Sequence, residues 1–141
     1  MQDKICLITG GNAGIGRATA IGLVKLGATV VILCKDKIKG EKTLKELSAL
    51  STFNKHQLLI ADLSDFSSIR NCVSEFERHF NKLDVLINNA GIFLTKLELS
   101  ENNIEKQFSV NHLGPFLLTQ LLLNSLLKSG NARIINLSST S

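Results

Sequence analysis

Hydrophobic residues gather in five short runs along the chain, and the segments between them repeat apolar positions every three or four residues. The runs cover residues 4–10, 28–34, 56–63, 83–91 and 132–139. Each run is continuously apolar rather than alternating, which is typical of strands buried on both faces of a parallel sheet. The pattern therefore predicts five parallel strands.

The intervening segments have the spacing of amphipathic helices, the first two over residues 14–26 and 38–50. A third helix is introduced by Ser64 and Asp65 as candidate caps. Its apolar positions are Ile69, Val73, Phe76 and Phe80. Because right-handed crossovers place helices on both faces of such a sheet, we expect a three-layer α/β fold. This is a doubly wound parallel sheet of about five strands, forming one domain over residues 1–141.

Composition supports one folded domain, since 44% of the 141 residues are apolar, 20% are charged and only one is proline. The net charge of +4 is concentrated in five lysines between positions 35 and 45. No basic stripe with interleaved aromatic residues extends beyond them, so no nucleic-acid partner is expected.

The cysteines and the lengths of the apolar stretches indicate the cellular compartment of the protein. Cys6, Cys34 and Cys72 are too far apart for a metal-ligand pair or a disulfide framework, and we interpret them as small buried hydrophobes in a reducing compartment. No metal site is predicted. The first residues lead directly into a strand, and the longest apolar stretch is shorter than the ~20 residues that span a bilayer. We therefore expect a cytoplasmic protein without a leader or membrane span.

A glycine-rich turn follows the first predicted strand and opens the first helix. It consists of Gly10, Gly11, Asn12, Ala13, Gly14, Ile15 and Gly16. Glycine allows a tight turn and a close approach of backbone N–H groups to a diphosphate, and the helix N-terminus adds partial positive charge. The segment is not a P-loop, because no GK[ST] follows. It predicts a dinucleotide site in a Rossmann-type fold.

The segment TGGNAGIG resembles the TGxxxGxG motif of the short-chain dehydrogenase/reductase superfamily. Three further motifs follow in the family's order: DLSD at 62–65, NNAG at 88–91 and VNHLG at 110–114. The segments CKDKIKGE, DLSD and VNHLGPFLLT are similar to those of the retinol dehydrogenase-like branch. The resemblance covers the whole chain and implies an NAD(P)-dependent oxidoreductase that interconverts a small-molecule alcohol and a carbonyl.

The end of the second strand indicates which dinucleotide is preferred. A carboxylate there accepts hydrogen bonds from a ribose diol, whereas a cation accommodates a 2′-phosphate. This chain has Cys34 followed by Lys35, at a position where the resembled family carries Arg. We expect NADP(H) to be preferred, with NAD(H) as the weaker alternative, because Lys lacks the fork of Arg and Asp36 is adjacent.

The resemblance also implies that Asp62 and the Leu63 backbone bind adenine, and that Asn89, Ala90 and Gly91 line the cofactor cleft. Two alternatives remain open from the residues themselves. Asp62 is also a good cap for the helix that starts nearby. The two amides of NNAG are equally suited to tying strand and loop together.

Two catalytic positions of the family have counterparts, Asn111 and Ser139. Pro115 lacks an N–H, so the carbonyl of Asn111, four positions earlier, would lose its helical partner. We expect a kinked helix with a bound water between these residues. The alternative places Pro115 in the first turn of a helix that begins near Gly114. His112 is expected to face solvent.

The family's YxxxK acid/base pair has no counterpart, because the chain contains no tyrosine. We expect a truncated form that is inactive by itself, with strand 132–139 left as an apolar edge. The resemblance implies that the apolar helix near 115–128 pairs two copies into a homo-oligomer. Alternative functions are a non-catalytic nucleotide-binding or regulatory module, and a methyltransferase of the same topology, against which Cys34 argues.

Overall fold

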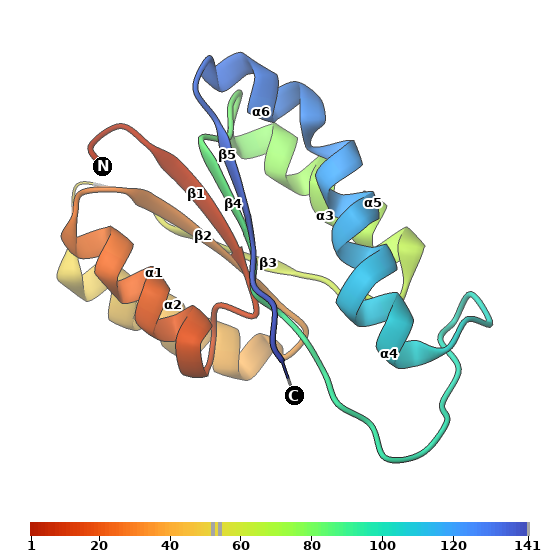
Figure 1. The fold of residues 1–141 in the computed structure, drawn as a ribbon. Helices are drawn as coiled ribbons and strands as arrows, with labels where there is room; N and C mark the ends of the chain where they lie inside the picture. The colour runs from red at the N-terminus through yellow and green to blue at the C-terminus, as the bar shows by residue number, and fades with distance from the viewer. Residues whose placement is uncertain (52, 54, 141) are drawn as a thin grey trace.

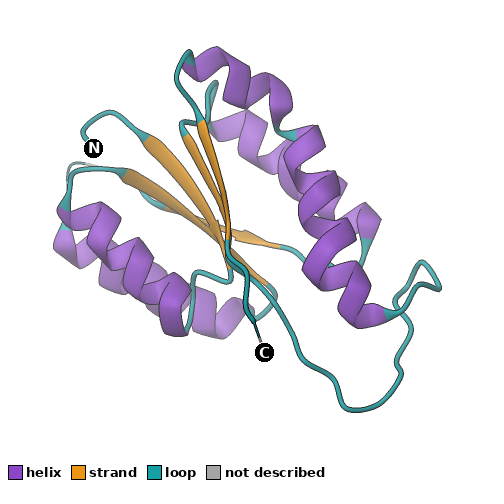
Figure 2. Cartoon of the chain, in the orientation of Figure 1, coloured by secondary structure: helices purple, strands orange, loops and turns teal. Residues whose placement is uncertain are grey.

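The computed structural model describes residues 1–51, 53 and 55–140, which form a parallel sheet flanked by helices (Figures 1 and 2). The strands are β1 Ile5–Thr9, β2 Thr29–Cys34, β3 Gln57–Ile60, β4 Val85–Asn88 and β5 Arg133–Asn136. Their order across the sheet is β3-β2-β1-β4-β5, and all pairings are parallel. The predicted doubly wound α/β fold is confirmed.

Helices cover both faces of the sheet, as Figure 1 shows. On one face lie α1 (Gly14–Lys25) and α2 (Lys37–Leu50). On the other face lie α3 (Phe66–His79), α5 (Gly114–Leu121) and α6 (Leu123–Ser129). A short helix α4 (Lys106–Phe108) and a π-helical segment η1 (Ser109–Leu113) lead into α5.

Each central strand contributes to two separate cores. In β1, Leu7 packs with the α3, α5 and α6 side of the sheet, whereas Cys6 and Ile8 pack with the α1 and α2 side. Since successive side chains of a strand point to opposite faces, both faces need apolar residues. This explains why the strand sequences are continuously apolar. All three cysteines are free and buried, as predicted.

Two acidic side chains begin helices. Asp65 caps α3, because its carboxylate accepts hydrogen bonds from the backbone N–H groups of Ser67 and Ser68. Asp36 caps α2 by accepting from the N–H of Lys39 at 3.0 Å. Of the two predicted caps for α3, Asp65 is therefore confirmed and Ser64 is wrong, since α3 begins one residue after Asp65.

The chain departs from α-helical geometry immediately before Pro115. Across η1 the N–H of Gly114 donates to the carbonyl of Ser109, five positions earlier, which is the pattern of a π-helix. A departure from α-helical geometry is thus present, while the kink itself stays a prediction. Pro115 lies in the first turn of α5, as the alternative expected. The bound water at this place stays a prediction.

Apolar side chains remain exposed along one edge of the molecule. Among the described residues β5 pairs only with β4, and Ile134 and Ile135 are each 44% exposed. Leu118 and Leu122 of the α5–α6 region are buried, while Phe116 is exposed. Pairing of two copies through this region stays a prediction. No helix within the described ranges has the length and apolar character needed to cross a membrane.

Candidate functional site

The glycine turn lies at the carboxyl end of β1, directly before α1. The N–H of Gly10 donates to the carbonyl of Leu33 at 2.8 Å, and Gly10 has a φ of +66° that favours glycine. A Cβ on Gly16 would overlap the carbonyl oxygen of Gly10 and lie 2.5 Å from Nδ2 of Asn89. The first turn of α1 therefore packs against the end of β1 too closely for any side chain at position 16.

Thr9 and Asn89 hold this turn against the end of β4. The Oγ1 of Thr9 accepts hydrogen bonds from the N–H groups of Asn89 and Ala90, both at 2.9 Å. In return, Nδ2 of Asn89 donates to the carbonyls of Thr9 at 3.0 Å and Gly10 at 3.3 Å. The amide of Asn89 thus ties strand to loop, which was one of its two predicted roles. The role of Thr9 was not predicted, although a lone hydroxyl in a buried aliphatic strand is a signal for it.

Among the residues that the structure describes, no side chain caps the N-terminus of α1. Its N-cap residue, Ala13, makes no side-chain hydrogen bond, and its first turn contains no acidic residue. Unsatisfied N–H groups and the helix dipole favour an anion at such a position. Arg17 lies in the same turn but forms an ion pair with Glu46 of α2. The turn and helix start therefore fit the diphosphate of a dinucleotide.

A cavity of about 280 Å³ opens beside the turn, where β1, β2, β3 and β4 end. Seven of the predicted cofactor residues line it: Gly10, Asn12, Lys35, Asp62, Leu63, Ala90 and Gly91. They come from four loops that are far apart in the sequence. Because open α/β sheets bind ligands beyond the carboxyl ends of their strands, this cavity is the candidate nucleoside site.

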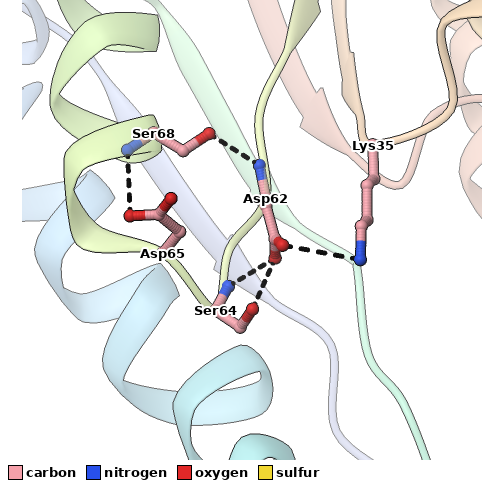
Figure 3. A network of polar contacts seen from close by, with 5 residues as sticks. All are labelled: Lys35, Asp62, Ser64, Asp65 and Ser68. Atoms are coloured by element: carbon pink, nitrogen blue, oxygen red, sulfur yellow. Dashed lines mark hydrogen bonds and ion pairs between the residues drawn. The ribbon is translucent and has the colours of Figure 1, made fainter. Parts of the chain in front are cut away.

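Asp62 and Lys35 meet at the wall of this cavity (Figure 3). Oδ1 of Asp62 accepts hydrogen bonds from the N–H of Ser64 at 2.9 Å and its hydroxyl at 2.6 Å. Oδ2 lies 3.4 Å from Nζ of Lys35. Burial alone would raise the pKa of Asp62, but the Ser64 hydrogen bonds and the Lys35 ammonium hold it below its ordinary value. Asp62 does not cap α3, so that alternative is wrong.

The remaining residues of the predicted cofactor set lie around the turn rather than in this cavity. Gly11 and Gly16 are buried under it. Ala13, Gly14 and Ile15 are exposed at the start of α1. These positions suit contacts through the backbone, and their roles in binding stay predictions.

Asn111 and Ser139 come together at a second cavity of about 600 Å³, next to the loop that follows β4. The side chain of Asn111 makes two hydrogen bonds with the backbone of Ile92: Oδ1 accepts from its N–H and Nδ2 donates to its carbonyl, both at 2.8 Å. The amide of Asn111 therefore fixes this loop. His112 is exposed and stacks on Phe108 at 5.2 Å, which confirms its predicted orientation.

Asn88, the last residue of β4 and the neighbour of Asn89, connects β4 to β5 and α5. Its Nδ2 donates to Oδ1 of Asn136 in β5 at 2.8 Å and to Oγ1 of Thr119 in α5 at 3.3 Å. The three side chains line another cavity, of about 520 Å³, which Asn111 also borders. The first asparagine of NNAG therefore has the structural role that the residues alone allowed.

Comparisons with known proteins agree with this architecture. The sequence profile described as short chain dehydrogenase matches residues 4–141. The chain is 44% identical to retinol dehydrogenase 12 of Mus musculus over 139 residues, and 43% identical to retinol dehydrogenase 11 of Homo sapiens over 141 residues. Both matches cover 99% of this chain but only 44% of the relative, so the chain spans less than half the length of these proteins.

Solved structures of enzymes share the fold over nearly the whole chain. The Pseudomonas aeruginosa RhlG/NADP active-site complex matches with a TM-score of 0.84 and 33% identity, covering 99% of this chain and 56% of that one. Levodione reductase matches with a TM-score of 0.82 and 28% identity, covering 99% and 55%. The chain therefore belongs to the short chain dehydrogenase family and, within it, resembles the retinol dehydrogenases.

Proposed function

We propose that this chain is the NADP(H)-binding portion of an oxidoreductase that interconverts an alcohol and a carbonyl. The observation that carries the proposal is the glycine turn held by Thr9 and Asn89, next to an uncapped helix N-terminus and a cavity containing Lys35. Solved neighbours with NADP or NADPH in their descriptions support a nicotinamide dinucleotide. The retinol dehydrogenase relatives support a lipophilic alcohol as substrate class.

Each part of the proposed site has a defined task. The backbone of residues 10–16 and the start of α1 would bind the diphosphate. Asp62 and the backbone of Leu63 would bind the adenine, and Lys35 would face the 2′-phosphate. When bound, the nicotinamide supplies or accepts the hydride. Ser139 is suited to orient the substrate oxygen, because a hydroxyl donor stabilises the negative charge that develops there.

The preference for NADP(H) over NAD(H) rests on the charges at the end of β2. Cys34 provides no acceptor for a ribose diol, and the carboxylate of Asp36 is already engaged as the N-cap of α2. Lys35 is the cation that lines the cavity at this strand end, and its side chain is 68% exposed. Replacing Lys35 with Ala should therefore lower NADPH affinity while leaving NADH affinity nearly unchanged.

Nucleotide titration of the 141-residue chain tests the proposal, with the fluorescence of the reduced nicotinamide as the signal. We expect saturable binding of NADPH and weaker binding of NADH, without turnover of an alcohol or a carbonyl, because the chain has no tyrosine for the acid/base pair. Absence of saturable binding of either nucleotide to folded protein contradicts the proposal. Binding without turnover in a longer form that contains YxxxK would instead favour the regulatory module.

Two glycines of α1 provide a matched pair of variants. Gly16→Ala places a methyl group against the carbonyl of Gly10 and should reduce NADPH affinity at least tenfold by displacing the turn. Gly22→Ala lies in the same helix with nothing within 4 Å of the added Cβ. It should retain NADPH binding and stabilise the chain by about 0.5–1 kcal/mol through helix propensity. Equal NADPH affinities in the two variants would show that the position of the turn does not matter for NADPH binding.

A further inference from the structure

The pair formed by Lys35 and Asp62 joins two residues for which separate roles in nucleotide binding are proposed. Lys35 follows β2 and Asp62 follows β3, and both line the cavity of about 280 Å³. Their Nζ and Oδ2 atoms are 3.4 Å apart. The ammonium expected to meet a 2′-phosphate is therefore already paired with a carboxylate.

The two partners differ in how firmly they are held. Asp62 is fixed by the turn before α3, since Oδ1 accepts both hydrogen bonds from Ser64 and its own N–H donates to Oγ of Ser68 at 2.9 Å (Figure 3). The side chain of Asp62 is 29% exposed, whereas that of Lys35 is 68% exposed and carries a flexible stem. Asp62 is thus the stationary charge, and Lys35 is the one that can turn toward a ligand.

A phosphate that recruits Lys35 must compete with this stationary carboxylate. Lys binds phosphate as a point charge without bidentate geometry, so a second anion at 3.4 Å shares the same charge. The neighbouring acids are engaged elsewhere: Asp36 caps α2 and Asp65 caps α3. Asp62 is the carboxylate that forms an ion pair with Lys35.

We propose that Asp62 is a specificity-determining residue that limits discrimination between dinucleotides with and without a 2′-phosphate, by competing for Lys35. The inference rests on the proposed function, because it concerns nucleotide binding at the same cavity. The two carboxylate oxygens of Asp62 then have different roles, one in structure and one in nucleotide selectivity. One oxygen is held by Ser64 and keeps the turn in place, whereas the other sets the charge available at Lys35.

Asp62→Asn tests the inference with little change of shape. The amide oxygen keeps the acceptor for Ser64, and the amide nitrogen cannot pair with Lys35. Dissociation constants for NADPH and NADH are measured on the 141-residue chain at one fixed ionic strength. Because adenine is common to both ligands, altered adenine contacts cancel in the ratio of the NADH constant to the NADPH constant. We expect this ratio to rise about threefold, the scale of a partly exposed ion pair.

Asp65→Asn is the matched control. It removes the same charge three residues away, and asparagine caps α3 as well as aspartate does. The ratio should stay at the wild-type value. In a Lys35→Ala background, Asp62→Asn should no longer change the ratio, because the cation for which the carboxylate and the 2′-phosphate compete is absent. An unchanged ratio in Asp62→Asn, an equal rise in Asp65→Asn, or a rise that persists without Lys35 overturns the inference.

A measurement on the nucleotide-free chain checks the ion pair itself. Titration of the Asp62 carboxyl by carbon-13 NMR should show its pKa rising in Lys35→Ala, since the ammonium helps to keep that pKa low. An unchanged pKa overturns the inference while leaving the proposed function intact. Failure of wild-type protein to bind either nucleotide, with the pKa responding as expected, contradicts the proposed function instead.

Discussion

β1 is held to its neighbours by side chains at both ends of the sheet, but a charged side chain does this at the amino end and neutral ones at the carboxyl end. At the amino end, the buried carboxylate of Asp84 accepts hydrogen bonds from the N–H of Ile5 at 2.8 Å and the hydroxyl of Ser129 at 2.5 Å, and pairs with Lys82 at 3.1 Å. At the carboxyl end, the neutral side chains of Thr9 and Asn89 make the ties between β1 and β4.

The difference follows from what each end has to accommodate. A carboxylate makes stronger hydrogen bonds than a hydroxyl, so it suits the amino end, where no diphosphate is proposed to bind. The same charge beside the glycine turn would repel a diphosphate, whereas a hydroxyl and an amide join the strands without adding charge. The comparison indicates that the amino end contributes to stability alone, and that the carboxyl end couples stability to binding.

The largest effect is expected at the amino end. Asp84→Ala removes the acceptor for Ile5 and Ser129 and leaves Lys82 without its carboxylate, so we expect a loss of about 3 kcal/mol in the free energy of unfolding. Chemical denaturation measures this loss. The ratio of NADH to NADPH dissociation constants should not change, and Glu101→Ala, at an exposed site, should alter stability by less than about 0.5 kcal/mol. An altered ratio in the folded Asp84 variant would show that the amino end also affects nucleotide binding.

An intermediate effect is expected at Thr9. Thr9→Val keeps the shape of the side chain but removes the acceptor of the Ala90 N–H, and it leaves the Asn89 N–H with the carbonyl of Ile87 at 3.1 Å. We expect a loss of about 2 kcal/mol in unfolding free energy, together with weaker NADPH binding, because the turn is no longer held against β4. Thr9→Ser retains the hydroxyl and should restore most of both quantities. Full NADPH affinity in a destabilised Thr9→Val variant would show that the two are not coupled.

The smallest effect concerns His56, which lies just before β3 at the amino end. Its Nδ1 accepts the N–H of Val30 at 3.0 Å, so this nitrogen must be unprotonated, and burial lowers the pKa of the imidazole. A lowered native pKa means that the stabilisation is complete above the ordinary histidine value of about 6.5 and is lost as the pH falls below it. Unfolding free energies measured from pH 8 to 5 should therefore decrease.

Two glutamine variants assign this pH dependence. His56→Gln keeps an acceptor for Val30 but does not titrate, so its stability should vary less with pH than that of the wild type. His79→Gln changes an exposed histidine at the end of α3 and should leave the wild-type dependence in place. Equal slopes in the wild type and His56→Gln would remove His56 as the cause.

The order of elements and the position of the glycine turn could be predicted because both depend on local patterns. Continuous apolar runs indicated the strands, and the residues of the nucleoside cavity were identified from separate motifs. The contacts between these motifs could not be predicted in the same way. The tie of Thr9 to Asn89 spans 80 residues and that of Asn111 to Ile92 spans 19, so both depend on tertiary packing. Lys35 and Asp62 were each identified, but their ion pair was not.

The reach of the Thr9 hydroxyl has a consequence for how the site forms during synthesis. The glycine segment is synthesised before residues 89 and 90, whose amides fix it. Until β4 has docked, the segment lacks the hydrogen bonds that hold it against the end of that strand. We therefore expect a nascent chain to bind nucleotide only after more than half of these 141 residues have been made.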